Sequence, residues 1–369
     1  MPFKDLVYVG TYSEPIRFGT GQILQGRGKG IYCYRFDREA GALSLLGITE
    51  GVRNSSYIAF DPARKFLFCV NEYKEYQGRA SGAVSAYSIN HETGALTYLN
   101  TVASHGTDPC HLIADKTGRF LLIANFASGS VCVLPVHAGG SLGEAVQVIQ
   151  HEGSSVDPRR QAGPHAHAVE IDKQNRFVFV PDLGLDRIVI YAFDEKTGRL
   201  TPNAAQPFVR TAPGAGPRQL VMSPDGRFAY LINELNSTMT AYRYDSARGA
   251  LTELHTLPTL PKHFEGQSTC AEVQITPDGK FLYGSNRGDD SLAIYAIDHA
   301  SGLLTLKGHE STRGRIPRNF EISPCGKFLA AANQDTHNIV MFKLNPETGR
   351  LTPTGDVAEA GTPICVRFM

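Results

Sequence analysis

One segment of this chain is written six times, and no other feature restricts the possible folds as strongly. Each copy contains an apolar strand, a charged turn and a second apolar strand that begins with Phe. The copies lie about fifty residues apart, and strand repeats near this period indicate a propeller or another repeat array. The copies are Ala59–Glu72, Ile113–Phe126, Glu170–Leu183, Val221–Glu234, Gln274–Arg287 and Glu321–Gln334.

A second motif, a hairpin rich in alternating Val, Ile, Tyr and Phe, lies between these copies. It occurs seven times, once in a weaker form that starts at Ser130. The other six hairpins carry a Gly just before their final Leu, which suits a turn position with positive φ. These glycines are Gly41, Gly94, Gly198, Gly249, Gly302 and Gly349.

The two motifs together make four-stranded blades, but the first motif is one copy short. The chain ends supply the missing strands, because Leu6–Tyr12 reads as its second strand and Thr362–Met369 as its first. A blade shared between both ends closes the ring and hides its edges. We therefore predict an all-β fold: a seven-bladed β-propeller of four-stranded blades, closed by pairing the N- and C-terminal strands. No break in composition divides the chain, so we expect a single domain over residues 1–369.

Composition and charge exclude several partners. The net charge is zero, which gives no support for nucleic-acid binding. The first residues lack the pattern of a signal peptide, and no apolar run approaches the roughly 20 residues that span a bilayer. The seven cysteines are odd in number and scattered, which favours free thiols in a reducing cytoplasm. We expect a cytoplasmic monomer or weak homo-oligomer without a nucleic-acid or membrane partner.

Comparison of the repeat copies also shows the positions at which single copies carry a different type of residue. The residue ten before each Phe begins the innermost strand, and the residue six after the Phe ends the next strand. Because these strands are antiparallel, both positions lie at the same edge of the blade and ring one mouth of the central channel. The polar departures are His167, Arg218 and Arg318 in the first set, with Glu72, Glu234, Arg287 and Gln334 in the second.

Three arginines, a histidine and a carboxylate at one mouth suit an anionic, oxygen-rich ligand. Arg matches carboxylate or phosphate with a planar fork, and His exchanges protons near neutral pH. The alternative is a plug of salt bridges that closes the channel, although buried charge without a task is costly.

Two further histidines, His165 and His111, have different expected positions. His165 and His167 are two apart on a strand and share a face, so His165 is a candidate for substrate binding. A metal held by this pair is a weak alternative without a third ligand at fixed spacing, and we expect neither metal nor cofactor. His111 follows Cys110 and is expected to point away from the channel and to pack.

Four long loops are expected at the same mouth, where they would restrict access. The first contains several glycines but no phosphate-binding P-loop, and we interpret it as a lid or rim. The loops are Ser13–Lys29, Tyr73–Ser81, Gln150–Pro164 and Pro261–Thr269.

Segments such as VYVGTY, PHAHAVEID and GPRQLVMSPDGRFAYLINEL are similar to those of the propeller-type lactonase family, over essentially the whole chain. This family includes bacterial 6-phosphogluconolactonases and the fungal 3-carboxy-cis,cis-muconate lactonizing enzyme. The resemblance implies that His167, Arg218, Glu234 and Arg287 match the His, two Arg and Glu of the fungal enzyme's proposed site. It leaves the choice between His165 and His167 open.

We therefore expect a lactone hydrolase acting on an anionic sugar lactone, with 6-phosphogluconolactone as the preferred candidate. His167 or Glu234 would activate water without a metal, and the other of the two would protonate the ring oxygen as it leaves. Arg218 and Arg287 would complete the catalytic set, and Arg318 would bind substrate. His165, Glu72 and Gln334 are the other expected substrate-binding residues. No GxSxG motif supports a covalent route.

Two other functions remain open at this point. One is a cycloisomerase that closes an unsaturated diacid to a lactone, with the arginines holding carboxylates. The other is a non-catalytic scaffold, since a propeller fold alone does not give function.

Overall fold

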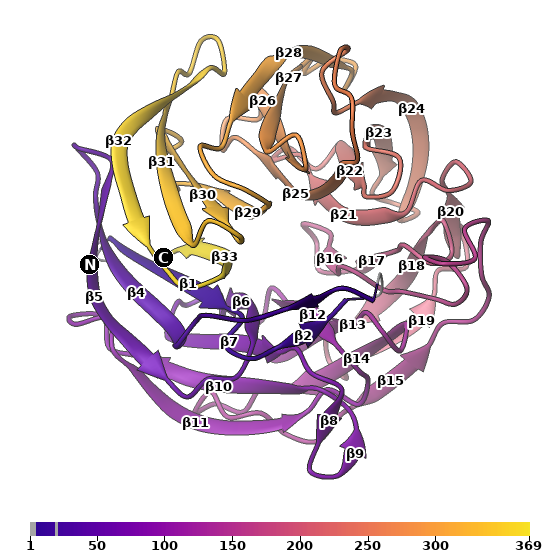
Figure 1. Cartoon of the computed structure of the whole chain (residues 1–369). Coiled ribbons are helices and arrows are strands. Elements are labelled where there is room, and N and C mark those ends of the chain that lie inside the picture. Colours follow the sequence, from indigo (N-terminus) through magenta and orange to yellow (C-terminus); the bar gives the residue numbers. More distant parts are fainter. Residues whose placement is uncertain (1–4, 19–20) are drawn as a thin grey trace.

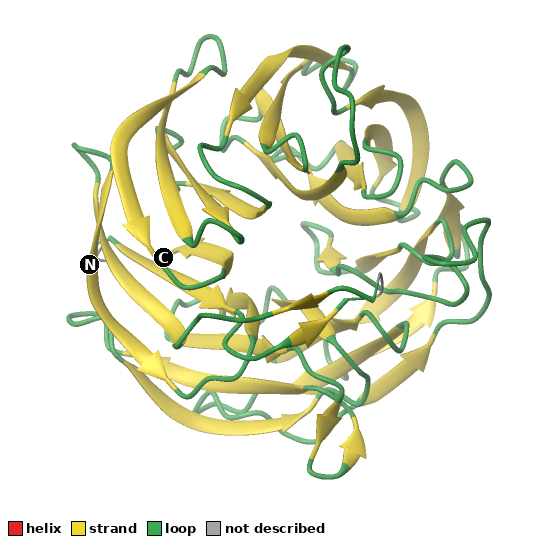
Figure 2. Cartoon of the chain, in the orientation of Figure 1, coloured by secondary structure: helices red, strands yellow, loops and turns green. Residues whose placement is uncertain are grey.

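The structure, a computed structural model, describes residues 5–18 and 21–369. Residues 1–4, at the start of the expected domain, and residues 19–20, inside the expected loop Ser13–Lys29, lie outside the described residues. Strands and loops make up the described part of the chain, without a helix (Figure 2). Seven sheets stand around a central channel, and the innermost strands of all seven face its axis (Figure 1). The prediction of a seven-bladed β-propeller is therefore confirmed.

The first blade closes the ring, as predicted. Its strand order from the channel outward is β33 (Pro363–Phe368), β1 (Leu6–Thr11), β4 (Gly30–Asp37) and β5 (Ala42–Glu50). β1 pairs antiparallel with β33, with Val9 opposite Val366. The two ends of the chain are thus joined by backbone hydrogen bonds within one sheet, which completes the first blade.

The other six blades follow in chain order, each running outward from the channel. The second contains β6 (Ser55–Phe60), β7 (Phe66–Asn71), β10 (Ala83–Ile89) and β11 (Leu96–Ala103). The third contains β12 (Pro109–Ala114), β13 (Phe120–Asn125), β14 (Ser130–Pro135) and β15 (Gln147–Gln150). The fourth contains β16 (Glu170–Ile171), β17 (Phe177–Asp182), β18 (Arg187–Asp194) and β19 (Arg199–Pro202), with β20 (Phe208–Arg210) also paired to β18.

The last three blades are complete and regular. They are β21 (Pro217–Met222) to β24 (Ala250–Pro258), β25 (Thr269–Ile275) to β28 (Leu304–Ser311), and β29 (Pro317–Ile322) to β32 (Leu351–Glu359). Between them lie β22 (Phe228–Asn233), β23 (Thr238–Asp245), β26 (Phe281–Arg287), β27 (Ser291–Ile297), β30 (Phe328–Asn333) and β31 (Asn338–Leu344). Two small ribbons, β2 (Ile16–Arg17) with β3 (Ile23–Leu24) and β8 (Glu75–Tyr76) with β9 (Arg79–Ala80), project from the loops.

The glycines of the second motif lock neighbouring blades together. All six have positive φ, as predicted, and Gly249 has φ 64°. A Cβ on Gly249 would collide with the ring of Phe177, the first residue of β17 in the preceding blade. The same relation joins Gly198 to Phe120 and Gly302 to Phe228. The two sequence motifs therefore recur together because the Phe of one blade packs against the hairpin turn of the next.

This contact can be tested by replacing Gly249 with Ala. The new methyl group meets both a left-handed backbone and an occupied site, so we expect the free energy of unfolding to fall by about 2–4 kcal/mol. Gly51→Ala is the matched control, because Gly51 has φ 76° with no atom near its Cβ position. Its cost should stay near 1 kcal/mol. Equal shifts in the urea unfolding midpoints of the two variants would show that the Phe177 contact contributes nothing.

Candidate active site

Most innermost strands carry a β-bulge at the position that the repeat analysis selected. Pro217 lies opposite Asn233 and Gln219 opposite Ile232, so Arg218 is the extra residue of β21. The same irregularity falls at Cys110 in β12 and Arg318 in β29. A bulge redirects side chains, so that two successive residues can face the same side of a strand. Each of these strands thus offers the channel a pair of neighbouring side chains.

The bulge overturns one prediction. We expected His111 to point away from the channel because residues alternate along a strand. His111 is packed and buried, as expected, but it borders a small internal cavity of the channel together with Cys110 and His167. The bulge at Cys110 cancels the alternation and brings both residues to this cavity. Arg218 lines the same cavity from β21.

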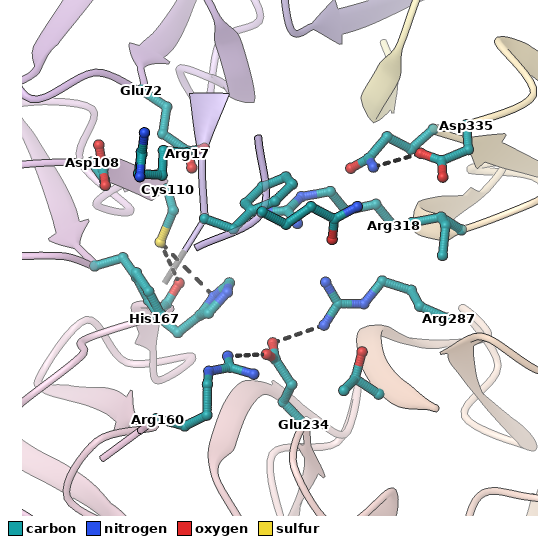
Figure 3. Close-up of a pocket in the computed structure, with 16 residues that line it drawn as sticks. Arg17, Glu72, Asp108, Cys110, Arg160, His167, Glu234, Arg287, Arg318 and Asp335 are labelled. Atoms are coloured by element: carbon teal, nitrogen blue, oxygen red, sulfur yellow. Dashed lines mark hydrogen bonds and ion pairs between the residues drawn. The ribbon is translucent and has the colours of Figure 1, made fainter. Parts of the chain in front are cut away.

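A larger cavity of about 220 Å³ opens above this one at the mouth of the channel (Figure 3). The loop that carries β2 lies across this mouth and contributes Arg17 and Phe18 to the wall, as expected of a rim (Figure 1). The remaining charged or titratable lining residues are Glu72, Asp108, Cys110, Arg160, His167, Glu234, Arg287, Arg318 and Asp335.

Glu234 is the centre of the charge cluster in this cavity. Its Oε2 accepts from Arg218 Nε at 3.0 Å and pairs with Arg287 Nη2 at 2.9 Å, and its Oε1 accepts from Arg160 Nη2 at 2.7 Å. Its side chain is only 7% exposed. Burial alone would raise the pKa of Glu234, but the three guanidinium groups outweigh it and hold the pKa well below its usual range. Glu234 is therefore ionised at neutral pH, with both oxygens occupied.

Arg287 and Arg218 are fixed further by backbone carbonyls. Arg287 Nη2 donates to the Cys270 carbonyl at 2.7 Å, and Arg218 Nη1 donates to the Ala271 carbonyl. Burial lowers the pKa of Arg287 to about 10, which still leaves it charged at neutral pH. Arg218 does not border the larger cavity and supports Glu234 from below.

His167 reaches the cavity from an irregular stretch before β16. Side chains of the neighbouring blade bind backbone groups of this stretch in place of a strand partner, so the strand is short. Cys110 Sγ donates to the His167 carbonyl at 3.2 Å, and the Val169 amide donates to His111 Nδ1 at 3.3 Å. Burial, then the charges of Arg218, Arg318 and Arg287, hold the pKa of His167 well below its usual value. Its imidazole is thus neutral at pH 7 and can accept a proton.

Among the described residues, Arg318 lies against aromatic rings and makes no direct ion pair. Its guanidinium lies 5.6 Å from the Tyr12 ring centre and 5.5 Å from that of Phe18. Within the described residues, it has no carboxylate or carbonyl partner at hydrogen-bond distance. Burial alone would lower the pKa of Arg318, but the charges of Tyr12, Glu72 and Glu234 outweigh it and raise the pKa. Arg318 therefore presents free donors to whatever fills the cavity.

Of the remaining predicted residues, Glu72 and Gln334 line the cavity and His165 does not. Glu72 lines the cavity and accepts from the Tyr12 hydroxyl at 2.9 Å. Gln334 also lines it, with a buried Oε1 that lacks a partner among the described residues. His165 does not border the cavity, since its ring stacks on Phe126 at 4.6 Å and its Nδ1 meets the Phe126 carbonyl at 2.9 Å.

Asp108 and Arg160 are among the lining residues that the sequence analysis missed. Asp108 lies two residues before Cys110, just outside the aligned repeat positions. Asn54, Ile316 and Thr362 stand at the equivalent position in other blades and, like Asp108, have positive φ. Extending the repeat alignment by two residues would have found it. Arg160 lies in the loop Gln150–Pro164, outside any repeat, and its only signal was the expected position of that loop at the mouth.

The loop that carries Arg160 is anchored by a buried histidine. His151 lies with Nδ1 2.7 Å from Asp182 Oδ2 and with Nε2 2.9 Å from the Tyr191 hydroxyl. Asp182 Oδ1 also accepts from the His165 amide at 2.7 Å. These contacts fix the start and the end of the loop, which explains how a segment without strands can position a guanidinium beside Glu234.

The described residues contain no group of three or more His, Cys, Asp or Glu side chains suited to a metal ion. In the same residues, no helix is long and apolar enough to cross a membrane. All seven cysteines are free thiols, and six of them are buried; Cys325 is exposed.

Replacing Glu234 with Gln should show how strongly the cluster depends on its carboxylate. Removing one partner leaves three nearby guanidinium groups without compensation, so we expect the free energy of unfolding to fall by about 3–5 kcal/mol. Glu310→Gln is the matched control, because its partner Arg313 is 57% exposed. That surface pair should cost about 0–1 kcal/mol. Urea unfolding that shifts equally in both variants would contradict this assignment.

Comparison with known proteins agrees with the fold. Residues 6–368 match the family described as "Lactonase, 7-bladed beta-propeller". The 6-phosphogluconolactonase of Bacillus subtilis is 34% identical over 317 residues, covering 86% of this chain and 84% of the relative. That of Formosa agariphila is 33% identical over 295 residues, covering 79% and 82%. The solved periplasmic gluconolactonase of Pseudomonas aeruginosa superposes with a TM-score of 0.90 at 35% identity, covering 99% of each chain. The chain belongs to the seven-bladed β-propeller lactonase family.

Proposed function

We propose that this protein is a 6-phosphogluconolactonase that opens its sugar lactone by direct attack of water. One observation carries the proposal: a cavity at the channel mouth brings together a neutral imidazole, His167, and the guanidinium of Arg318, which has no direct ion pair among the described residues. Relatives named 6-phosphogluconolactonase and a gluconolactonase support the reaction class. An anionic lactone needs cations for its charge and a base for water, and the cavity offers both.

His167 is the general base in this proposal. Its low pKa leaves the imidazole unprotonated at neutral pH, ready to take a proton from water as the water attacks the lactone carbonyl. Glu234 is less suited to this step, because three arginines occupy its oxygens and lower its pKa. Its role is to hold Arg287, which lines the cavity, and Arg218, which lies beneath it.

The arginines divide into two groups. Arg287 and Arg160 are bound to Glu234 and are held in fixed directions, as needed to stabilise the oxyanion that develops on the carbonyl oxygen. Arg318 and Arg17 have no acidic partner within 4 Å among the described residues, and they are the candidates for the substrate's phosphate. Glu72 and Gln334 would contact the sugar hydroxyls from the same cavity.

The other functions fit the cavity less well. A scaffold does not require a cluster of buried Arg, His and Glu around an open cavity, and retaining one is energetically costly. A cycloisomerase would use the same arginines for carboxylates, but no residue of the cavity favours a diacid over a phosphosugar. We also propose that residues 1–369 act as one unit, as a monomer or weak homo-oligomer. Six buried free thiols support a cytoplasmic location.

The test is hydrolysis of freshly made 6-phosphogluconolactone, corrected for spontaneous opening. Wild-type protein should accelerate it, and Arg318→Met should lower kcat/KM by about 10²–10³, the usual loss for one anion-stabilising donor. Arg313→Met, a change at an exposed ion pair, should stay within about twofold.

Two results would overturn this proposal. One is retention of wild-type kcat/KM in both Arg318→Met and His167→Ala. The other is loss of a muconate's ultraviolet absorbance with wild-type protein while the phosphosugar lactone is ignored, which would identify the cycloisomerase.

A further inference from the structure

Two carboxylates, Glu72 and Asp108, lie together on one side of the cavity, across from Arg287 and Arg318 (Figure 3). The His167 ring lies between the two sides (Figure 3). Nothing in the proposed mechanism so far uses Asp108. It is 7% exposed and lines the cavity, with a backbone φ of 51° that departs from ordinary strand geometry.

The Asp108 carboxylate is unusual because the protein does not satisfy it. Among the described residues, no donor reaches it at hydrogen-bond distance, and its nearest cation is the Lys74 ammonium, 3.7 Å from Oδ2. Lys74 is itself 57% exposed, so solvent weakens this pairing. The backbone on both sides is nevertheless fixed, because the Asp108 amide donates to the Tyr73 carbonyl and the Phe126 amide donates to the Asp108 carbonyl. A buried acid held rigidly without donors is costly unless it has a task.

We infer that Asp108 is the general acid that gives its proton to the ring oxygen of the lactone as the carbon–oxygen bond breaks. This inference rests on the proposed lactonase function. It assigns the second proton transfer, which the hydrolysis needs at the ring oxygen, to a residue outside the family resemblance.

The other acids of the cavity are less suited to this role. Glu234 is held ionised by three arginines, and Glu72 accepts from Tyr12. Asp335 accepts from Gln334 at 2.9 Å, and burial raises the pKa of the Cys110 thiol well above its usual value.

The surroundings of Asp108 favour a carboxyl that exchanges protons near neutral pH. Burial, and then the negative charge of Glu72, raise the pKa of Asp108 to about 7, while Lys74 lowers it in part. The other titratable or charged groups nearby are Cys110, two residues further along the chain, and Arg17, on the loop that carries β2. His167 and Asp108 thus have pKa values displaced in opposite directions, which is the arrangement expected of a base and an acid that work together.

In the proposed hydrolysis, His167 accepts one proton and Asp108 donates one. Water adds to the lactone carbonyl, and His167 takes one water proton. The tetrahedral intermediate collapses with cleavage of the bond between the carbonyl carbon and the ring oxygen, and that oxygen takes the Asp108 proton and becomes a hydroxyl. The new carboxylic acid releases its proton to water. Exchange with solvent moves the proton from His167 back to Asp108, so both residues return to their starting states.

Asp108→Asn tests the role directly, because Asn keeps the shape but has no acidic proton to donate. We expect kcat on 6-phosphogluconolactone to fall by about 10²–10⁴, with KM changed by less than about threefold. A variant with wild-type kcat, or one that loses only KM, would overturn the inference while leaving the lactonase function established by the wild-type rate.

A second test does not depend on altering Asp108 itself. As an acid, Asp108 works only when protonated, so activity should decline as the pH rises through its pKa near 7. Lys74→Met removes a positive charge that lowers this pKa, so the decline should move to higher pH. Glu72→Gln removes a negative charge that raises it, so the decline should move to lower pH. Lys65→Met, at an exposed position outside the cavity, should leave it in place.

Opposite shifts in the first two variants, after subtraction of spontaneous opening, would support the assignment. A decline that stays fixed in both variants, or that moves the same way in both, would overturn it. A purely structural role for Asp108 predicts the fixed outcome, because the pH profile would then report another group.

Discussion

The structure depends on a contact that is repeated around the ring: an aromatic side chain at the start of one blade's second strand packs against the glycine turn of the next blade's hairpin. Phe177 with Gly249 and Phe228 with Gly302 are two examples. Each contact needs a turn without a Cβ and an aromatic ring directly opposite. A blade has no core of its own, so such contacts between neighbours must add up over a closed ring. The chain ends complete that ring through the pairing of β1 with β33.

A rigid ring allows charge to be buried at its mouth. Two blades and the loop that carries Arg160 hold three guanidinium groups within 3.0 Å of one carboxylate, an arrangement that a flexible site would relax by admitting water. Burial lowers the pKa of His167 first, and Arg218 and Arg287 of the cluster around Glu234 lower it further. The buried charges therefore contribute to the protonation state of the proposed base. On the other side of the cavity, burial and the negative charge of Glu72 raise the pKa of Asp108 to about 7. Structure and proposed chemistry are therefore linked by electrostatics.

The repeats allowed the ring, the closing blade and the residues of the mouth to be predicted, because each repeat is a control for the others. The departures Arg287, Arg318 and His167 all line the cavity, whereas Arg218 lies just beneath it. His165 was predicted to bind substrate because it shares a strand face with His167, but its ring stacks on Phe126 and does not border the cavity.

What could not be predicted has physical reasons. The bulge at Cys110 changes the direction of His111, and bulges have no reliable signature in a single sequence. Arg160 reaches Glu234 from a loop whose course depends on the long-range contact between His151 and Asp182. Asp108 stands in the repeat, but its importance comes from missing hydrogen-bond donors, and only the packed structure shows which donors are missing.

The most direct test of the account is a single turnover of 6-phosphogluconolactone in water labelled with ¹⁸O, with enzyme in excess over substrate. Direct attack of activated water predicts one ¹⁸O atom in the carboxylate of the product, none in its new hydroxyl group, and none in the protein. Label recovered in a side chain such as Asp108 or Glu72 after proteolysis would contradict the account, because it would show that a protein carboxylate attacks the lactone first. A turnover no faster than spontaneous opening would contradict the lactonase function itself.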